Sequence, residues 1–271
     1  MTDRPDNAPF ESAIAKLSAR GIMPTALSAA EIAELDLAIR ETSFFSSRVE
    51  SSALLQSMRD YLTDYLALSR APDGALVAQG RAEFVANMRE AAIRLGLGKV
   101  GKDGKISPVI NERDVTDIRS IRRLQLVFDT QVESSFSYGQ FRESQDPAIL
   151  KAFPCQRFLR VRPVQVPRPY HAQHDGDVRR KDDLKFWLSM NRDFRVPWGP
   201  WGYGSGMGVE DVGRREAIRL GVIPADAVVS PLSTPFAGNL SAGVKHLDKD
   251  ITDQLSRATG GTLADGTLTP R

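Results

Sequence analysis

Two histidines and two aspartates lie close together in the segment RPYHAQHDGD at residues 168–177. Two imidazoles and a carboxylate can bind a transition metal, and a metal held there could activate water for hydrolysis. His171, His174 and Asp175 are therefore the candidate ligands of a metal-dependent hydrolase or nuclease. The segment also follows two prolines and contains an Asp-Gly pair, which predicts a loop in which these side chains hydrogen-bond to stabilise a turn. We favour this second interpretation and predict no metal here.

Other residue types that could do chemistry lack the neighbours that catalysis requires. Cys155 has no sequence signature of an activating base beside it. Ser205 is flanked directly by glycines, so the G-x-S-x-G pattern of a nucleophile elbow is absent. The glycine-rich segment at 199–208 has neither a Walker nor a Rossmann context and predicts an irregular loop with positive φ angles. We therefore predict no catalytic residue, no cofactor and no small-molecule substrate.

A cluster of arginines offers a different kind of chemistry. Its members are Arg157, Arg160, Arg162 and Arg168, and the basic triplet at 179–181 follows. On one surface these side chains could contact the phosphates of DNA or an acidic partner. Aspartates lie within a few residues of them, so ion pairing inside the protein is an equally strong interpretation.

Composition limits the function further. The chain has 271 residues, with 36 Lys plus Arg against 34 Asp plus Glu and a formal charge of +2. This balance excludes a strongly basic nucleic-acid condenser and an acidic tail protein, but not a local patch. The single cysteine excludes an intrachain disulfide and a zinc site with paired cysteines. No apolar run is long enough to cross a membrane.

The first part of the chain, residues 1–97, predicts helices that must pack on one another. A capping box at Ser28 and Glu31 begins one helix, and apolar stripes indicate further helices over 46–69 and 76–95. Gly96 is a typical helix stop. The Gly- and Lys-rich stretch that follows predicts a linker over 98–112.

Residues 113–229 predict a mixed domain, so the fold class is α+β with a small antiparallel sheet and long irregular loops. We expect a long helix capped by Asp114 or Asp117, a short helix after Asp146, a strand over 157–162 and a short helix over 213–220. Residues 230–271 predict an extension with one helix over 245–257 and a mobile end.

From about residue 44 to residue 223 the chain resembles the Mu protein F-like head morphogenesis family, the minor head proteins of tailed phages and prophages. The resemblance rests on motifs in a fixed order, namely Arg168-Pro169-Tyr170-His171, Asp175-Gly176, Asp182-Asp183 with Phe186-Trp187, Pro197 with its glycine-rich loop, and VEDVGRREAIRLG at 209–221. Many members carry a C-x-C pair where this chain has Ser205-Gly206-Met207. A cysteine-dependent metal or crosslink is therefore not expected at that point.

The resemblance implies a structural virion component that is made in the cytoplasm of the bacterial host and enters the phage head near the portal. Portal and capsid proteins would be its partners, packaged DNA a further contact, and a membrane would not be involved. The N-terminal helices would dock on protein partners through their apolar stripe. The matched residues would be fold determinants, not a catalytic set: His171, Asp175, Gly176, Asp183, Trp187 and Pro197. The alternatives are the metal-dependent enzyme and an effector module carried by a prophage.

Overall fold

The computed structural model describes residues 8–68, 74–232, 242–243, 253, 256–257, 262–264 and 267–269. The fold class is α+β, as the sequence predicts. Packing divides the chain into two compact units, one formed by Met1–Ala13 with Glu133–Thr234 and the other by Ile14–Val132 with Pro235–Arg271. This division lies within helix α6 (Ile121–Ser144), whereas the sequence suggests a boundary at 98–112. None of the described helices is long and apolar enough to cross a membrane.

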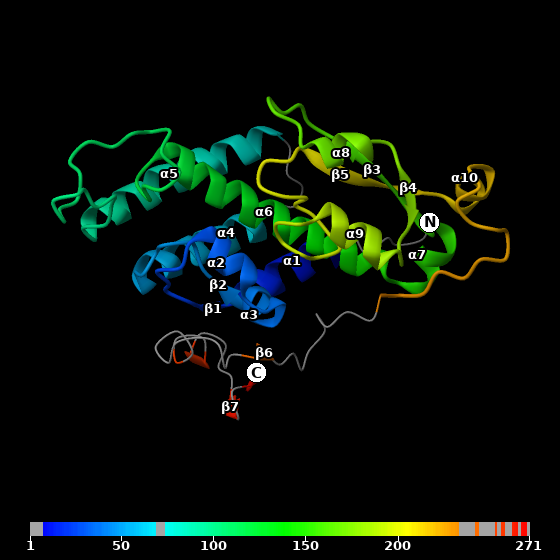
Figure 1. The fold of residues 1–271 in the computed structure, drawn as a ribbon, viewed down its shortest axis with the longest axis horizontal. Helices are drawn as coiled ribbons and strands as arrows, with labels where there is room; N and C mark the ends of the chain where they lie inside the picture. The colour runs from blue at the N-terminus through cyan, green and yellow to red at the C-terminus, as the bar shows by residue number, and fades with distance from the viewer. Residues whose placement is uncertain are drawn as a thin grey trace. The chain divides into compact units, whose positions relative to one another are not determined.

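The unit that contains residues 14–132 is built mainly from helices (Figure 1). Its elements in chain order are the second part of α1 (Ala8–Ser18), β1 (Gly21–Ile22), α2 (Ala29–Glu34), α3 (Leu37–Thr42), β2 (Ser43–Phe44), α4 (Ser52–Leu68), α5 (Gly74–Arg94) and the first half of α6. β1 and β2 pair in parallel. Helix α1 is an element that the sequence patterns above do not predict.

Local signals explain where these helices begin. The capping box is confirmed, because the Ser28 hydroxyl accepts from the amide of Glu31 and the Glu31 carboxylate accepts from the amide of Ser28. Helix α4 begins six residues later than predicted, since Arg48 has a φ of 57° and Ser51 accepts from the amide of Leu54. The predicted caps of α6 are wrong. The Ser120 hydroxyl accepts from the amide of Arg123, while the Asp117 carboxylate accepts from the amide of Arg119, two residues before the helix.

The apolar stripe of the helices forms the core of this unit. Leu55, Met58 and Leu62 of α4 are fully buried, and Phe84 of α5 packs with its ring 5.5 Å from that of Phe128 in α6. A buried stripe stabilises the fold and offers no surface to a partner. The expectation that partners dock on this stripe is therefore wrong.

The unit that contains residues 133–234 is built around a three-stranded antiparallel sheet with the order β4-β3-β5 (Figure 1). Its elements after α6 are α7 (Pro147–Ala152), β3 (Cys155–Arg160), α8 (Pro169–Gln173), β4 (Val178–Arg180), α9 (Leu184–Met190), β5 (Met207–Val212) and α10 (Arg214–Arg219). The small antiparallel sheet and the helices after Asp146 and Gly213 are confirmed. The central strand lies two residues before its predicted position, because Val161 and Arg162 both donate to the carbonyl of Gly206 outside the ladder.

The two faces of this sheet have separate cores. On one face, Phe158 and Met207 pack against the α9 side chains Phe186 and Trp187 and against Trp201. Two of the three tryptophans thus share this aromatic core, while Trp198 packs against Tyr138 and Phe141 of α6.

On the other face, Cys155 packs with Val212 and with Ala217 of α10. Burial raises the pKa of the Cys155 thiol to about 11. Because the thiolate is the reactive form, this cysteine is a core residue and not a nucleophile.

The C-terminal extension is described only in part. Most of the predicted helix over 245–257 lies outside the described residues. The end is predicted to be mobile, but it contains β7 (Thr262–Ala264) and β8 (Thr267–Thr269), and β8 also pairs with β6 (Ala242–Gly243). The β-branched threonines beside leucine favour these strands, a signal that the glycine content obscures in the sequence.

Candidate functional site

The segment with the two histidines is a helix and not the predicted loop. Pro169 occupies the first turn of α8, where its fixed φ and missing N–H are both tolerated. His171 lies inside α8, and His174 is its C-terminal cap residue. Asp175 and Gly176 then form the turn into β4, and Gly176 has a φ of 94° that favours glycine.

His171 is fully buried on the sheet face that carries the aromatic core. Its Nε2 donates to the carbonyl of Met190 at 2.9 Å, and its ring lies edge-on to that of Phe158 at 5.4 Å. Nδ1 is buried and has no hydrogen-bond partner among the described residues. Burial lowers the pKa of His171 below its ordinary value of 6.5, so the native state holds a neutral imidazole.

The other two candidate ligands bind elsewhere. Nδ1 of His174 lies 2.9 Å from Oδ2 of Asp177, which also accepts from Arg179. Oδ1 of Asp175 accepts from the backbone amide of Arg160 at the end of β3. Among the residues that the structure describes, no group of three or more histidines, cysteines or carboxylates is arranged to hold a metal ion. His171, His174 and Asp175 therefore have separate structural partners and do not share a centre.

The neutral state of His171 predicts a specific loss of stability in acid. Because its pKa is lowered in the folded state, the unfolded chain binds the proton more readily below about pH 6.5. The contribution of this histidine is complete above that pH and is lost as the pH falls toward its native pKa. We expect denaturant unfolding to give a lower free energy at about pH 5.5 than at about pH 7.5.

The substitution His171→Gln keeps a donor for the carbonyl of Met190 but cannot titrate, so part of the pH dependence should disappear. His174→Gln is the matched control, because His174 is only half-buried. An equal pH dependence in His171→Gln and in the wild type would contradict the assignment.

The remaining motif residues bind the segment after β4 to the sheet. Asp183 caps α9 by accepting from the amide of Phe186 at 3.1 Å. Trp187 is buried, and its Nε1 donates to the carbonyl of Arg180 at 2.9 Å. Pro197 is buried as well, in the loop that follows α9. Each of these residues serves the fold.

Asn191 is a structural residue that the sequence patterns do not single out. It is fully buried at the C-terminal cap of α9, and its Nδ2 donates to the carbonyls of Val196 and Trp198. The helix end is thereby tied to the loop that carries the second and third tryptophans. An asparagine placed just after an apolar helix is the signal that could have identified it.

Lys181 is a buried lysine that the sequence patterns also do not single out. Nζ of Lys181 lies 2.9 Å from Oδ1 of Asp211, and the lysine side chain is almost completely buried. Gln156 donates to the same carboxylate oxygen across the β3–β5 pair. This pairing links the two edge strands over the central one.

The glycine-rich segment is an irregular loop, as predicted, and its glycines allow close backbone contacts. Gly202, Gly204 and Gly206 all have positive φ angles. A Cβ at Gly206 would lie 2.5 Å from the carbonyl oxygen of Arg162, so no larger residue fits there without a shift. Ser205 is buried, and its hydroxyl accepts from the amide of Met207. It therefore has no role as an exposed nucleophile.

The four arginines that could contact DNA each have partners within the protein. Arg157 pairs with Glu210 and Glu216 at 3.0 and 2.7 Å. Nη1 of Arg160 donates to the carbonyl of Ser205.

The other two arginines of this set, Arg162 and Arg168, also lie near carboxylates. Arg168 donates to Asp193 and to the carbonyl of Tyr203. Arg162 is half exposed and lies 3.8 Å from the carboxylate of Glu133. The internal ion pairing that the sequence left open is thus present at Arg157, Arg162 and Arg168, whereas Arg160 binds a backbone carbonyl.

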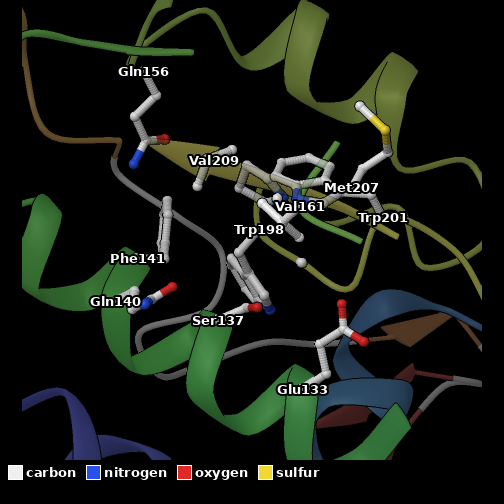
Figure 2. Close-up of a pocket in the computed structure, with 13 residues that line it drawn as sticks. Glu133, Ser137, Gln140, Phe141, Gln156, Val161, Trp198, Trp201, Met207 and Val209 are labelled. Carbon is white, nitrogen blue, oxygen red and sulfur yellow. The ribbon is translucent and has the colours of Figure 1, made fainter. Parts of the chain in front are cut away.

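Figure 2 shows a small pocket between α6 and the sheet. Aromatic and aliphatic side chains line its interior, including Phe141, Trp198 and Met207, and polar residues stand around it, including Ser137 and Gln156. Its volume is about 130 Å³, well below the few hundred Å³ of a typical ligand site. Glu133 is the single titratable residue in its lining, so the pocket holds no acid–base pair for catalysis. Comparison of the chain with protein-family models, with curated proteins and with solved structures found no match.

Proposed function

We propose that this chain is a structural minor head protein of a tailed phage or prophage, which takes part in head assembly at the portal and is not an enzyme. One observation carries the proposal: the residues that give the resemblance all serve the fold. His171 and Trp187 each donate to a backbone carbonyl, Asp175 and Asp183 each accept from a backbone amide, and Gly176 provides a left-handed turn.

This use of the motif residues favours a scaffold over a catalyst. A catalytic residue must present a lone pair or a proton to a substrate, whereas these polar atoms face the protein backbone. In our proposal the motif maintains a rigid unit that assembles with portal and capsid proteins. The chain is then made in the bacterial cytoplasm and carried into the phage head.

The proposal is tested in the phage or prophage that encodes the chain. We expect deletion of the gene to reduce the yield of infective particles, and mass spectrometry to detect the chain in purified heads. Heads that lack the chain, together with an unchanged particle yield, would contradict the proposal. Complementation with His174→Ala separates the proposal from the metal-dependent alternative, because a scaffold tolerates this change and a metal enzyme does not. Stoichiometric zinc, manganese or iron in the purified protein would favour the enzyme.

A further inference from the structure

The segment between α5 and α6 begins with a folded tip, which we define as residues 93–109. Helix α5 ends in a Schellman motif, in which the amide of Leu97 donates to Ala92 and Gly96 adopts a φ of 65°. An antiparallel bridge then joins Val100 to Ile106. The whole segment between the two helices extends as a green loop beyond their ends in Figure 1.

Hydrogen bonds and ion pairs fix this tip in one conformation. Within it, Gly101 donates to the carbonyl of Lys105, and Ser107 donates to that of Lys99. The base is held by the ion pair of Lys99 with Asp114 at 2.7 Å, which helps to lower the pKa of Asp114 to about 2. The tip is therefore preformed, although its composition predicts a linker.

Several aliphatic side chains of the tip are exposed and do not belong to the hydrophobic core. Val100 and Val109 are 59% and 75% exposed, and Ile106, the bridge partner of Val100, is 40% exposed. Ile93 and Leu95 at the end of α5 are also exposed. Side chains opposite each other across an antiparallel bridge lie about 5 Å apart, so Val100 and Ile106 form one apolar surface. Exposed aliphatic residues that adjoin one another on a preformed loop are a candidate interaction site.

Positive charge accompanies these aliphatic residues in the tip. Of its four cationic residues, Lys99 pairs with Asp114 and Arg94 with Glu90, which leaves Lys102 and Lys105 beside one acidic residue, Asp103. Asp103 accepts from the backbone amide of Lys105, so its carboxylate forms part of the turn. Lys102 and Lys105 are exposed. Charge complementarity therefore favours a partner that carries carboxylates beside an apolar surface.

Two other classes of partner fit these residues less well. The tip contains no aromatic residue to stack on a nucleic-acid base, and aliphatic side chains gain nothing from a phosphate backbone. A hairpin that enters a bilayer needs apolar residues at its apex, whereas Lys102 and Asp103 occupy the apex here.

We propose that the tip docks into an apolar surface of a folded protein, rimmed by aspartate and glutamate, and that this partner is the portal protein. The identity of the partner rests on the proposed function, while its chemistry rests on the tip alone. The aliphatic residues supply the contact area, and the lysines select the acidic rim and orient the encounter.

The experiment compares two tip variants with matched controls. Lys102→Glu with Lys105→Glu reverses the charge, and Val100→Ser with Val109→Ser removes apolar surface. The controls are Lys185→Glu with Arg219→Glu and Val166→Ser with Val228→Ser, which make the same changes at exposed positions elsewhere. Thermal melts first establish that all four proteins are folded.

Binding is then measured to the purified portal protein from the same phage or prophage, at low and at high salt. We expect each tip variant to weaken binding by about tenfold or more, the controls to bind like wild type, and salt to weaken wild-type binding. Tip variants that bind the portal like wild type would overturn the inference and leave the proposed function intact.

Further probes separate a failure of the proposed function from a failure of the inference. One probe is a helical peptide with leucine on one face and glutamate on the other. Its binding is compared with that of the same peptide in which serine replaces leucine. If wild type does not bind the portal, the proposed function fails, but tip-dependent preference for the leucine peptide still supports the inferred chemistry. Absence of that preference overturns the inferred chemistry of the partner. Tip-dependent binding to a DNA duplex or to phosphatidylserine vesicles, in place of the leucine peptide, overturns the inferred chemistry as well.

Discussion

Replacing Trp187 with alanine is expected to lower the free energy of unfolding by about 3–5 kcal/mol. The indole is buried, with ring centroids 4.9 Å from Phe186 and 5.6 Å from Trp201. Its removal leaves a cavity in the aromatic core and also removes the hydrogen bond to the carbonyl of Arg180. That carbonyl belongs to β4, so we expect both α9 and the edge of the sheet to loosen. Denaturant unfolding followed by circular dichroism measures the loss.

Two further variants serve as controls for the Trp187→Ala prediction. Trp187→Phe retains most of the packing but no donor, and it should lose less stability than the alanine variant. Tyr203→Ala removes a ring that is 44% exposed and should have a much smaller effect. If Trp187→Ala and Tyr203→Ala destabilise the protein equally, Trp187 does not have the core role that we assign to it.

The second large effect is expected at Glu41, the carboxylate of a buried charge cluster in the helical unit. Lys16 pairs with Glu41, and Arg20 lies 4.0 Å from the same oxygen. Burial by itself would raise the pKa of Glu41, but Lys16, Arg20 and Arg40 together lower it. Burial also lowers the pKa of Lys16 to about 8. Glu41 therefore stays ionised and compensates several buried cations.

The substitution Glu41→Gln removes the carboxylate that pairs with Lys16 and lies near Arg20 in a poorly solvated site. We expect the free energy of unfolding at neutral pH to fall by about 3–5 kcal/mol, as for other buried pairs that lose one partner. Adding Lys16→Met to Glu41→Gln should recover part of the loss, because the cation that faced Glu41 is then removed as well.

A surface ion pair provides the control for this prediction. Glu90 and Arg94 are paired on α5 with side chains that are mostly exposed. Glu90→Gln should therefore change stability by less than about 1 kcal/mol. A Glu41→Gln variant as stable as Glu90→Gln would show that the buried charges are not coupled as we describe.

Elements whose signals lie within a few residues of one another could be predicted from the sequence. The capping box at Ser28, the Asp146-Pro147 helix start and the glycine stop at 96 all appear where predicted. The α+β class follows from these local patterns, and all of them depend on backbone geometry over one or two turns.

The roles of the polar side chains depended instead on residues distant in the sequence. The sequence favours a structural role for His171 but cannot identify its partner, which is the carbonyl of Met190, nineteen residues away. Arg157 belongs to a basic run in the sequence, but it pairs with two glutamates more than fifty residues further on. The sequence does not show which charged residues pair, because the partners lie far apart along the chain and meet only in the folded sheet. Only the tertiary structure could therefore assign a role to each of these residues.

The tip at residues 93–109 is a second case that the sequence alone could not resolve. The sequence by itself established a helical first part, an aromatic α+β part and the residues 96–105 as a glycine- and lysine-rich break between helices. It could not distinguish a solvated linker from a rigid projection, because the composition is the same for both. That difference depends on the bridge between Val100 and Ile106 and on the ion pair of Lys99 with Asp114, two contacts that neither composition nor hydrophobic periodicity reveals.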